Sequence, residues 1–410
     1  MSTVSVDLLR ERSSMAWDGR RDAGTSLDRS AYTSEMAYQR DLDAIFARNW
    51  LFAGHAVDIA NPGDFRVVEL AGEQIILWRD LQGEIRAHFN VCRHRGSRLT
   101  WDSCGNARTL RCPYHQWTYR ADGSLAGARL MGEDFRPGDY PLAGVALREV
   151  GGLVFVCLSD DPPPFDPAAQ AMSPQVAPHG LDRAQVVRRE VYDVAANWKT
   201  VVENNRECYH CRVTHPEFNM SNYDVGLPGD PRAPADYQRT LDQAAERWRA
   251  LGLSPEAVSF PDGEWFRVAR MPLKDGFVTE TVDGALAAPL MGSITSPEVG
   301  SLRLIGLPNF WAHLNADYAS TTRLDPRGPN LTRVEVCFLV DRDARPGVDC
   351  DVEKLATVLQ RTFEQDIELC ESVSAGLSSR AWRPGPYSPI VEASVKSFNE
   401  WYLAQLSAAG

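Results

Sequence analysis

Hydrophobic and polar residues follow two different periods along this chain, and the change between them divides it into segments. Residues 35–50 carry apolar side chains at helical spacing. From residue 64 to residue 158 the pattern changes to short strands separated by turn residues, including 65–70 and 74–78 on either side of a glycine. The pattern therefore predicts an N-terminal helix followed by an all-β domain.

An acidic and proline-rich run, Asp160-Asp161-Pro162-Pro163-Pro164, ends the strand pattern. Proline lacks the N–H that a strand ladder or a helix interior needs, so we place a domain boundary here. We predict an N-terminal arm and helix over residues 1–47, a β domain over 48–160 and a second domain over 161–410.

The second domain mixes helical and strand patterns. Asn197 is a suitable N-cap for a helix that runs from Trp198 to about His210. Polar residues at spacings of four, four and three form one stripe on this predicted helix: Lys199, Glu203, Glu207 and His210. Such a stripe is usually a solvated helix face, and the residues that follow it make this one worth testing.

Composition narrows the class of protein. A length of 410 residues suggests two domains, and a net charge of −12 disfavours nucleic acid and anionic membrane surfaces as partners. No apolar run is long enough to span a bilayer, and the first residues do not resemble a signal peptide. With nine scattered cysteines, we expect a cytoplasmic protein.

Two short clusters pair one cysteine with one histidine each: Cys92-Arg93-His94, and Cys112-Pro113-Tyr114-His115. A Rieske [2Fe–2S] cluster needs two thiolates on one iron and two imidazoles on the other. A structural zinc ion could use the same residue types, but zinc sites usually place like residues together. Chance proximity of buried cysteines is the other alternative. We interpret the four residues as ligands of a Rieske cluster, which passes electrons one at a time.

The tips of the two clusters lack one feature of respiratory Rieske proteins. Those proteins join the tips by a disulfide, at positions that Ser97 and Tyr114 occupy here, and Cys104 has no evident partner. This favours the lower-potential Rieske type that supplies oxygenases.

A second metal motif lies in the second domain, where His210 and His215 follow Glu207. A non-haem Fe(II) oxygenase uses two histidines and one carboxylate on one face of the iron. A gap of five residues fits if the helix ends near His210 and a turn before Pro216 brings His215 back. The overlapping Cys208-x-x-Cys211 pair could indicate zinc or redox chemistry, and we interpret it as incidental.

The third iron ligand must be a distant carboxylate, and a predicted helix near the C-terminus offers several. Spacing alone does not choose among its acidic residues, which are Glu364, Asp366, Glu368 and Glu371.

The order of these motifs resembles the α-subunits of Rieske non-haem iron oxygenases, from about residue 35 onwards. Within that family, short segments are similar to the glycine betaine monooxygenase oxygenase components. These segments are 90–98, 112–119, 203–211, 270–273 and 384–388.

The resemblance implies an α+β protein, with an all-β Rieske domain and a helix-grip-like antiparallel sheet domain. It implies that Cys92, His94, Cys112 and His115 bind the cluster and that His210, His215 and Asp366 bind Fe(II). It also implies that Glu207 links His210 to a cluster histidine of the adjacent subunit in a homotrimer. A carboxylate at this position can in any case orient the imidazole of His210.

The resemblance is weaker around the expected substrate pocket. Quaternary ammonium groups favour aromatic faces and carboxylates favour arginine. The residues that could supply both are Trp265, Phe266, Arg267, Arg270, Trp311 and His313, although ordinary core and surface roles are the simpler explanation for them.

Three functions stay open at this point. The first is oxidative N-demethylation of glycine betaine or a related methylated ammonium acid, with dioxygen as co-substrate and formaldehyde as product. The second is oxygenation of another small molecule, such as an aromatic compound or a natural-product intermediate. The third is an electron carrier without oxygenase activity, which the complete iron motif disfavours. NADH electrons would come from a separate ferredoxin or flavin reductase, because no G-x-G-x-x-G follows a strand here.

Overall fold

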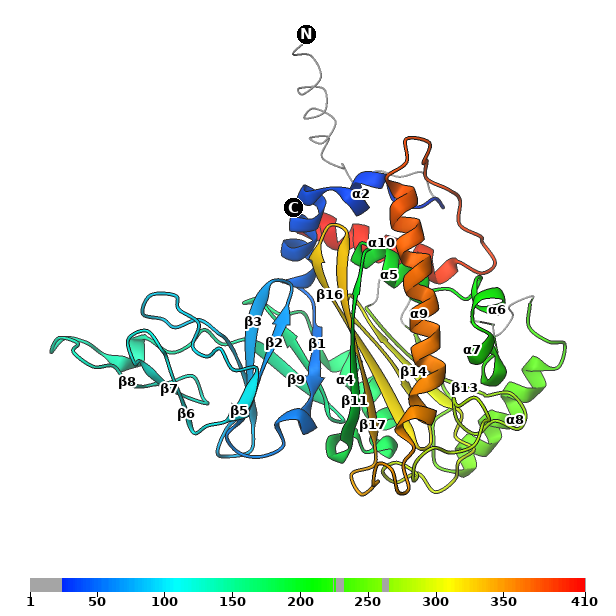
Figure 1. The fold of residues 1–410 in the computed structure, drawn as a ribbon, viewed down its shortest axis with the longest axis horizontal. Helices are drawn as coiled ribbons and strands as arrows, with labels where there is room; N and C mark the ends of the chain where they lie inside the picture. The colour runs from blue at the N-terminus through cyan, green and yellow to red at the C-terminus, as the bar shows by residue number, and fades with distance from the viewer. Residues whose placement is uncertain (1–23, 224, 226–231, 260–264, 410) are drawn as a thin grey trace, which may run out of the picture.

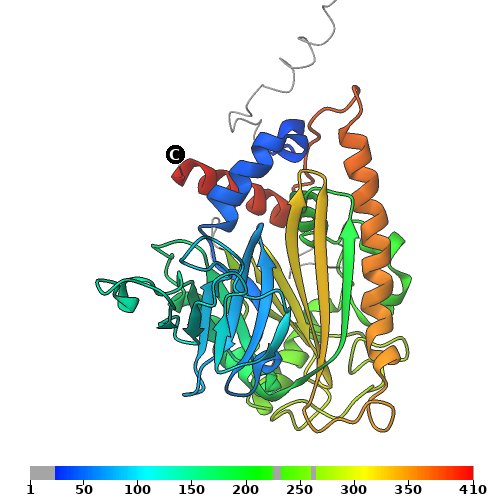
Figure 2. The same ribbon diagram turned by 60° about the vertical axis from the view of Figure 1, so that its left-hand side comes forward.

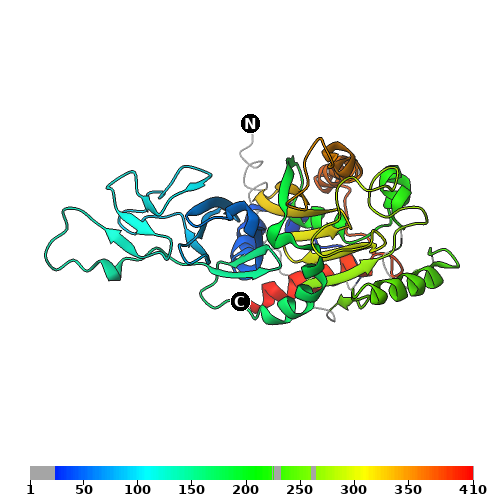
Figure 3. The same cartoon turned by 90° about the horizontal axis from the view of Figure 1, so that it is seen from below.

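The computed structural model describes residues 24–223, 225, 232–259 and 265–409. Figure 1 shows an elongated β part beside a larger part in which a long helix crosses one face of an antiparallel sheet. Seen from below in Figure 3, the two parts lie side by side along the longest axis. The α+β architecture is as predicted.

The β part contains three small antiparallel sheets. Their strand orders are β1-β10-β9, β4-β3-β2-β5 and β6-β7-β8. The predicted hairpin is present, with Phe65 opposite Trp78 across β2 and β3. The strands are β1 (Leu51–His55), β2 (Asp64–Leu70), β3 (Glu73–Arg79), β4 (Ile85–Phe89), β5 (Cys104–Asn106), β6 (Thr109–Arg111), β7 (Thr118–Arg120), β8 (Leu125–Gly127), β9 (Ala146–Val150) and β10 (Leu153–Cys157).

The larger part is organised by one seven-stranded antiparallel sheet. Its order is β11-β17-β16-β15-β14-β13-β12, so sequence neighbours pair except where β11 adds to the edge beside β17. The strands are β11 (Gln185–Val194), β12 (Val258–Ser259), β13 (Phe266–Met271), β14 (Ser301–Gly306), β15 (Phe310–Leu314), β16 (Tyr318–Gly328) and β17 (Leu331–Val340).

Helices cover this sheet and join it to the N-terminal segment. The 26-residue helix α9 begins after Asp351, whose side chain accepts the Lys354 N–H as a cap. The α-helices are α2 (Arg29–Thr33), α3 (Glu35–Asp41), α4 (Asp166–Val176), α5 (Trp198–Asn205), α6 (Cys211–Thr214), α7 (Pro216–Ser221), α8 (Tyr237–Ala250), α9 (Val352–Leu377) and α10 (Ala393–Ala408). Short 3₁₀ or π turns are η1 (Leu42–Phe46), η2 (Ala56–Ile59), η3 (Pro137–Asp139), η4 (Ala177–His179) and η5 (Leu181–Arg183).

The predicted helix after Asn197 is shorter than expected. Asn197 does cap it, accepting the Lys199 N–H, but α5 ends at Asn205 rather than near His210. Two asparagines, which are poor helix formers, close the helix, and the next residues turn away from its axis. Glu207 and His210 therefore lie in a loop between α5 and α6.

The polar stripe predicted on that helix is not a solvated face. Lys199 is fully buried and forms an ion pair with the equally buried Asp41 of α3. Trp198 and Tyr402 also donate hydrogen bonds to Asp41, at 2.8 and 2.6 Å. This shared carboxylate joins α5 to the N-terminal and C-terminal helices, which lie together in Figure 2.

The two parts share hydrophobic contacts across the predicted boundary. Phe52 of β1 packs against Phe310 of β15, with ring centroids 4.5 Å apart. The Asn309 side chain both accepts from the Phe52 N–H and donates to the Phe52 carbonyl. The β part is therefore held firmly against the sheet that carries the second metal motif.

Candidate metal centres and substrate cavity

The four residues of the first motif converge at the tips of two loops. Cys92 and His94 follow β4, and Cys112 and His115 follow β6. The two histidines face each other with their Nδ1 atoms 3.1 Å apart, while both cysteines are buried and free. Trp117 stacks on His94 at a centroid distance of 4.8 Å, which fixes the orientation of that ring.

The chemistry of this donor set fits a [2Fe–2S] cluster. Burial raises the pKa of the Cys92 thiol, and the adjacent Cys112 opposes ionisation further. A bound metal centre would reverse this effect, because thiolates are its ligands. The Tyr119 hydroxyl lies 3.7 Å from Cys92 Sγ and can stabilise the thiolate. The loops therefore bring together all four predicted ligands.

Replacing His115 with alanine removes one of the two imidazoles that face the cluster position. We expect the purified wild-type protein to be brown and to give a Rieske-type electron paramagnetic resonance signal on reduction, and the H115A variant to lose that signal. A colourless wild-type protein with stoichiometric zinc would contradict the assignment.

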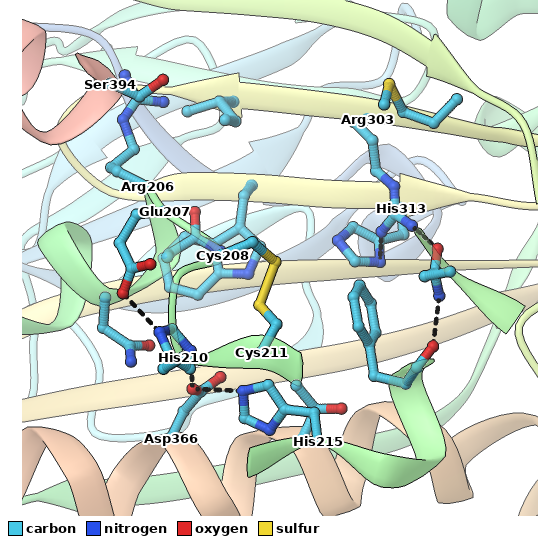
Figure 4. A pocket seen from close by; sticks show the side chains of 18 of the residues that line it. Arg206, Glu207, Cys208, His210, Cys211, His215, Arg303, His313, Asp366 and Ser394 are labelled. Atoms are coloured by element: carbon cyan, nitrogen blue, oxygen red, sulfur yellow. Dashed lines mark hydrogen bonds and ion pairs between the residues drawn. A yellow bond between two sulfur atoms is a disulfide. The ribbon is translucent and has the colours of Figure 1, made fainter. Parts of the chain in front are cut away.

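The second motif forms a compact set around one carboxylate oxygen. Asp366, on α9, places Oδ1 3.2 Å from His210 Nε2 and 3.0 Å from His215 Nε2 (Figure 4). Two imidazoles and one carboxylate therefore point toward a single position, as a facial iron triad requires.

Neighbouring side chains fix which nitrogen of each imidazole faces this position. His210 Nδ1 donates to Glu207 Oε1 at 2.5 Å, and His215 Nδ1 donates to Gln365 Oε1 at 2.8 Å. Both Nε2 atoms are thereby turned toward Asp366 as electron-pair donors. His215 Nε2 is buried, and its contact with Asp366 Oδ1 leaves it facing the position that a metal ion would take.

The electrostatics of the triad suit a cation. Burial opposes protonation of His210, but Asp366 and Glu207 outweigh it and raise the pKa of the imidazole to about 9. Burial likewise opposes ionisation of Asp366, and the two histidines lower its pKa. The site is thus strongly polarised to hold positive charge, which Fe(II) would supply.

The other acidic residues of α9 have different surroundings. Glu364 accepts from Gln360 and Arg361, Glu371 accepts from the Ala195 N–H, and Glu368 is exposed. The structure thus places Asp366 alone of these four beside His210 and His215.

One cysteine pair was interpreted wrongly from the sequence. Cys208 and Cys211 form a disulfide, with their Cα atoms 4.9 Å apart, and both line the cavity described below. The predicted helix ran through Cys208, but α5 ends at Asn205 and the backbone turns at this point instead. The disulfide closes the turn that contains His210 and so restricts where this imidazole can move.

A cavity of about 450 Å³ opens beside the triad between the sheet and α9. Its aromatic lining includes Phe218, Trp311 and Phe363, and its cationic lining includes Arg206 and Arg267. This volume suits a small organic molecule.

Strand alternation separates the predicted substrate residues into two groups. Along β13, Arg267, Ala269 and Met271 line the cavity, whereas Phe266 and Arg270 point to the opposite face. Arg267, Trp311 and His313 therefore line the cavity, where they can contact a substrate.

The other three predicted substrate residues lie outside the cavity lining, which corrects their expected placement. Phe266 packs in the core behind the sheet, and Arg270 donates to the Val299 carbonyl at 3.0 Å. Trp265 packs against Phe165, with ring centroids 5.7 Å apart.

Sequence reasoning missed Arg303, which lies beside His313 on the neighbouring strand. Its guanidinium pairs with the buried Glu280 and also contacts His313 and Asn222. Burial opposes ionisation of Glu280, yet Arg303 and His313 hold its pKa well below the usual range. The one sequence signal for Arg303 was the alternation of faces along its strand, which places it on the cavity side. Its counter-ion, Glu280, is distant in sequence and gave no signal.

Comparison with known proteins places these observations in a family. The Rieske [2Fe-2S] domain family matches residues 49–141, and the family described as ring hydroxylating alpha subunit (catalytic domain) matches residues 181–408.

Among the described residues, no helix is long and apolar enough to cross a membrane.

Curated relatives resemble the chain over nearly its full length. The glycine betaine monooxygenase oxygenase subunit of Chromohalobacter salexigens is 39% identical over 401 residues, covering 97% of this chain and 88% of the relative. The protein of the same description from Pseudomonas aeruginosa strain UCBPP-PA14 is 37% identical, covering 98% and 92% of the two chains.

Solved structures share the fold. The quaternary ammonium Rieske monooxygenase CntA, in complex with L-carnitine, matches with a TM-score of 0.70 at 22% identity, covering 94% of this chain and 96% of that one. Naphthalene 1,2-dioxygenase from a Rhodococcus species matches with a TM-score of 0.67 at 23% identity, covering 94% of each chain.

Proposed function

This chain belongs to the ring-hydroxylating α-subunit family of Rieske non-haem iron oxygenases, and we propose that it is the terminal oxygenase component of a monooxygenase that demethylates glycine betaine or a similar methylated ammonium acid. The observation that carries the proposal is a small cavity beside the His210–His215–Asp366 triad that offers both aromatic and guanidinium groups. Glycine betaine, which the names of the near full-length relatives give as substrate, carries a trimethylammonium group and a carboxylate, and these groups bind aromatic rings and guanidinium groups.

The reaction would consume one dioxygen and one NADH for each methyl group. When bound, Fe(II) would activate dioxygen for hydroxylation of an N-methyl C–H bond. The resulting hemiaminal collapses to the amine and formaldehyde, and the second oxygen atom leaves as water. Within this chain, Glu207 and Gln365 hold the two imidazoles in position, and Trp311 offers its ring to the ammonium group.

We propose that the functional assembly is a homotrimer in which the cluster loops of one chain meet the iron site of the next. Large hydrophobic side chains are exposed at both places: Trp101 (75%) and Tyr114 (56%) near the cluster, and Tyr209 (63%) and Val213 (86%) beside His210. Exposed apolar groups of this size favour a protein contact. The two metal sites of one chain also lie in different parts of the molecule (Figure 1), which favours electron transfer between chains.

Electrons would reach the cluster from a separate ferredoxin or flavin reductase that oxidises NADH. We place the reaction in the cytoplasm, where NADH is available.

Formaldehyde release tests this function. The reconstituted system, with a compatible reductase and NADH, should release one formaldehyde per dioxygen consumed from glycine betaine. A hydroxylated product without formaldehyde, from an aromatic or other small molecule, would instead support the second function. Dioxygen-independent electron transfer with no organic product across the substrate panel would support an electron carrier.

A further inference from the structure

Two arginines on the cavity wall have no carboxylate partner among the described residues. Arg206 follows α5, and Arg267 lies on β13, and both line the cavity. Within the described part of the chain, neither guanidinium pairs with a carboxylate, and Arg206 Nε is buried without a hydrogen-bond partner. Figure 4 shows Arg206 beside Ser394, on the side of the cavity opposite Arg303 and His313.

Such an arrangement is costly without a ligand. Burial, reinforced by the positive charge of Arg267, lowers the pKa of Arg206 to about 10, and burial also lowers the pKa of Arg267. Two like charges that face one cavity repel each other, and an anion between them would relieve both penalties. Guanidinium groups bind carboxylates through two parallel hydrogen bonds.

Arg303 does not offer the same opportunity. Glu280 already neutralises it, and His313 and Asn222 occupy its other donors. Arg270 lies outside the cavity and donates to a backbone carbonyl. Arg232 also lines the cavity and donates to the Cys208 carbonyl. Arg206 and Arg267 are therefore the cavity arginines available to an anion, because neither has a carboxylate partner among the described residues.

The sheet register places this charge at a defined distance from the aromatic wall. Arg267 lies opposite Ile305, and Ile305 lies opposite Trp311, so the three residues form one row across β13, β14 and β15. With neighbouring strands ~4.8 Å apart, the Cα atoms of Arg267 and Trp311 are ~10 Å apart. The side chains of Arg267 and Trp311 leave the same face of the sheet toward the cavity, with Ile305 between them, and a short zwitterion could span this row.

Trp311, at one end of this row, is the member closest to the proposed iron ligands. Trp311 stacks on Phe363, with centroids 6.3 Å apart, and Phe363 precedes Asp366 by one helical turn of α9. An acid held by its carboxylate at Arg267 would direct its opposite end toward the triad.

We propose that Arg206 and Arg267 together form a carboxylate-binding subsite that orients a short ammonium acid with its N-methyl groups toward His210, His215 and Asp366. This inference rests on the proposed function for the identity of the cationic end. The anion-binding role of the arginine pair can be tested separately.

Two probe molecules distinguish binding of the carboxylate from binding of the trimethylammonium group. The first is 3,3-dimethylbutanoate, which keeps the shape and carboxylate of glycine betaine but carries carbon in place of nitrogen and cannot be demethylated. The second is choline, which keeps the trimethylammonium group and lacks the carboxylate. Binding of each probe and of glycine betaine to the metal-loaded holoprotein is measured by titration calorimetry, without reductant.

The variants are R206M and R267M, with R206K and R267K as milder changes. We expect each methionine variant to weaken 3,3-dimethylbutanoate and glycine betaine binding at least tenfold, while choline binding changes less than twofold. Each lysine variant should fall between wild type and methionine, because lysine keeps the charge but not the two-point contact. R239M, at an exposed residue of α8 that pairs with Asp236, is the control for loss of a positive charge.

Iron content and the spectrum of the reduced cluster confirm that each variant is folded. Unchanged 3,3-dimethylbutanoate binding in both methionine variants, or loss of binding only in R303M, would overturn the carboxylate subsite. If the anion binds through Arg206 and Arg267 but the wild type releases no formaldehyde from glycine betaine, the subsite stands and the proposed substrate is wrong. If the wild type demethylates glycine betaine and neither arginine variant changes its KM, the function stands and the subsite is wrong.

Discussion

Replacing Asp366 with alanine is expected to empty the mononuclear iron site and abolish turnover, while the reduced cluster keeps its full electron paramagnetic resonance signal. Asp366 Oδ1 is the point on which His210 Nε2 and His215 Nε2 converge, at 3.2 and 3.0 Å. Without it, two neutral imidazoles remain, and they bind Fe(II) weakly. Iron per chain, determined together with acid-labile sulfide, separates mononuclear iron from cluster iron.

The cluster should be unaffected because its four ligands lie on loops of the β part, after β4 and β6. Glu368→Ala is the matched control, since it removes an exposed carboxylate from the same helix two residues away. Full iron occupancy and turnover in D366A, with loss of iron in the Glu364, Glu368 or Glu371 variant, would assign the third ligand elsewhere.

The ligand motifs were predictable because their chemistry is local in sequence. Cys92 and His94 are separated by one residue and Cys112 and His115 by two, so a short loop suffices to bring each pair to one metal. The β-hairpins and the N-cap at Asn197 follow from equally local rules. The choice of Asp366 among four acids needed the family resemblance, because burial and contacts across the chain decide it.

The features that sequence reasoning missed depend on contacts between distant segments. The orientation of Phe266 and Arg270 away from the cavity depends on the register of β13, and shifting a strand by one residue exchanges its two faces. The Lys199–Asp41 pair joins residues 158 positions apart, so the spacing on α5 alone does not show that Lys199 is buried in an ion pair. The helix end at Asn205 and the disulfide beside His210 reflect the turn that the iron ligands require.

Replacing Glu207 with glutamine is expected to leave both metal centres loaded and to lower product formation by about two orders of magnitude. Glu207 Oε1 accepts the Nδ1–H of His210, and Oε2 accepts the Tyr209 N–H of the same loop. Each carboxylate oxygen has a second lone pair, so Oε2 can also accept a hydrogen bond from a donor on a neighbouring chain. Glutamine keeps the size but loses the charge and replaces one acceptor with a donor.

The decisive measurement is the rate at which a pre-reduced cluster is reoxidised on mixing with substrate and dioxygen. In E207Q the reductase should reduce the cluster normally, and reoxidation should slow in proportion to product formation, because the proposed link from His210 through Glu207 to a neighbouring chain would be weakened. E207D, which keeps the charge on a shorter side chain, should recover part of the rate. If Glu207 only stabilises its loop, E207Q will change the free energy of unfolding by less than about 0.5 kcal/mol and leave turnover unchanged. Near-wild-type reoxidation with both metals present would therefore remove Glu207 from the electron path and weaken the case for a homotrimer built around it.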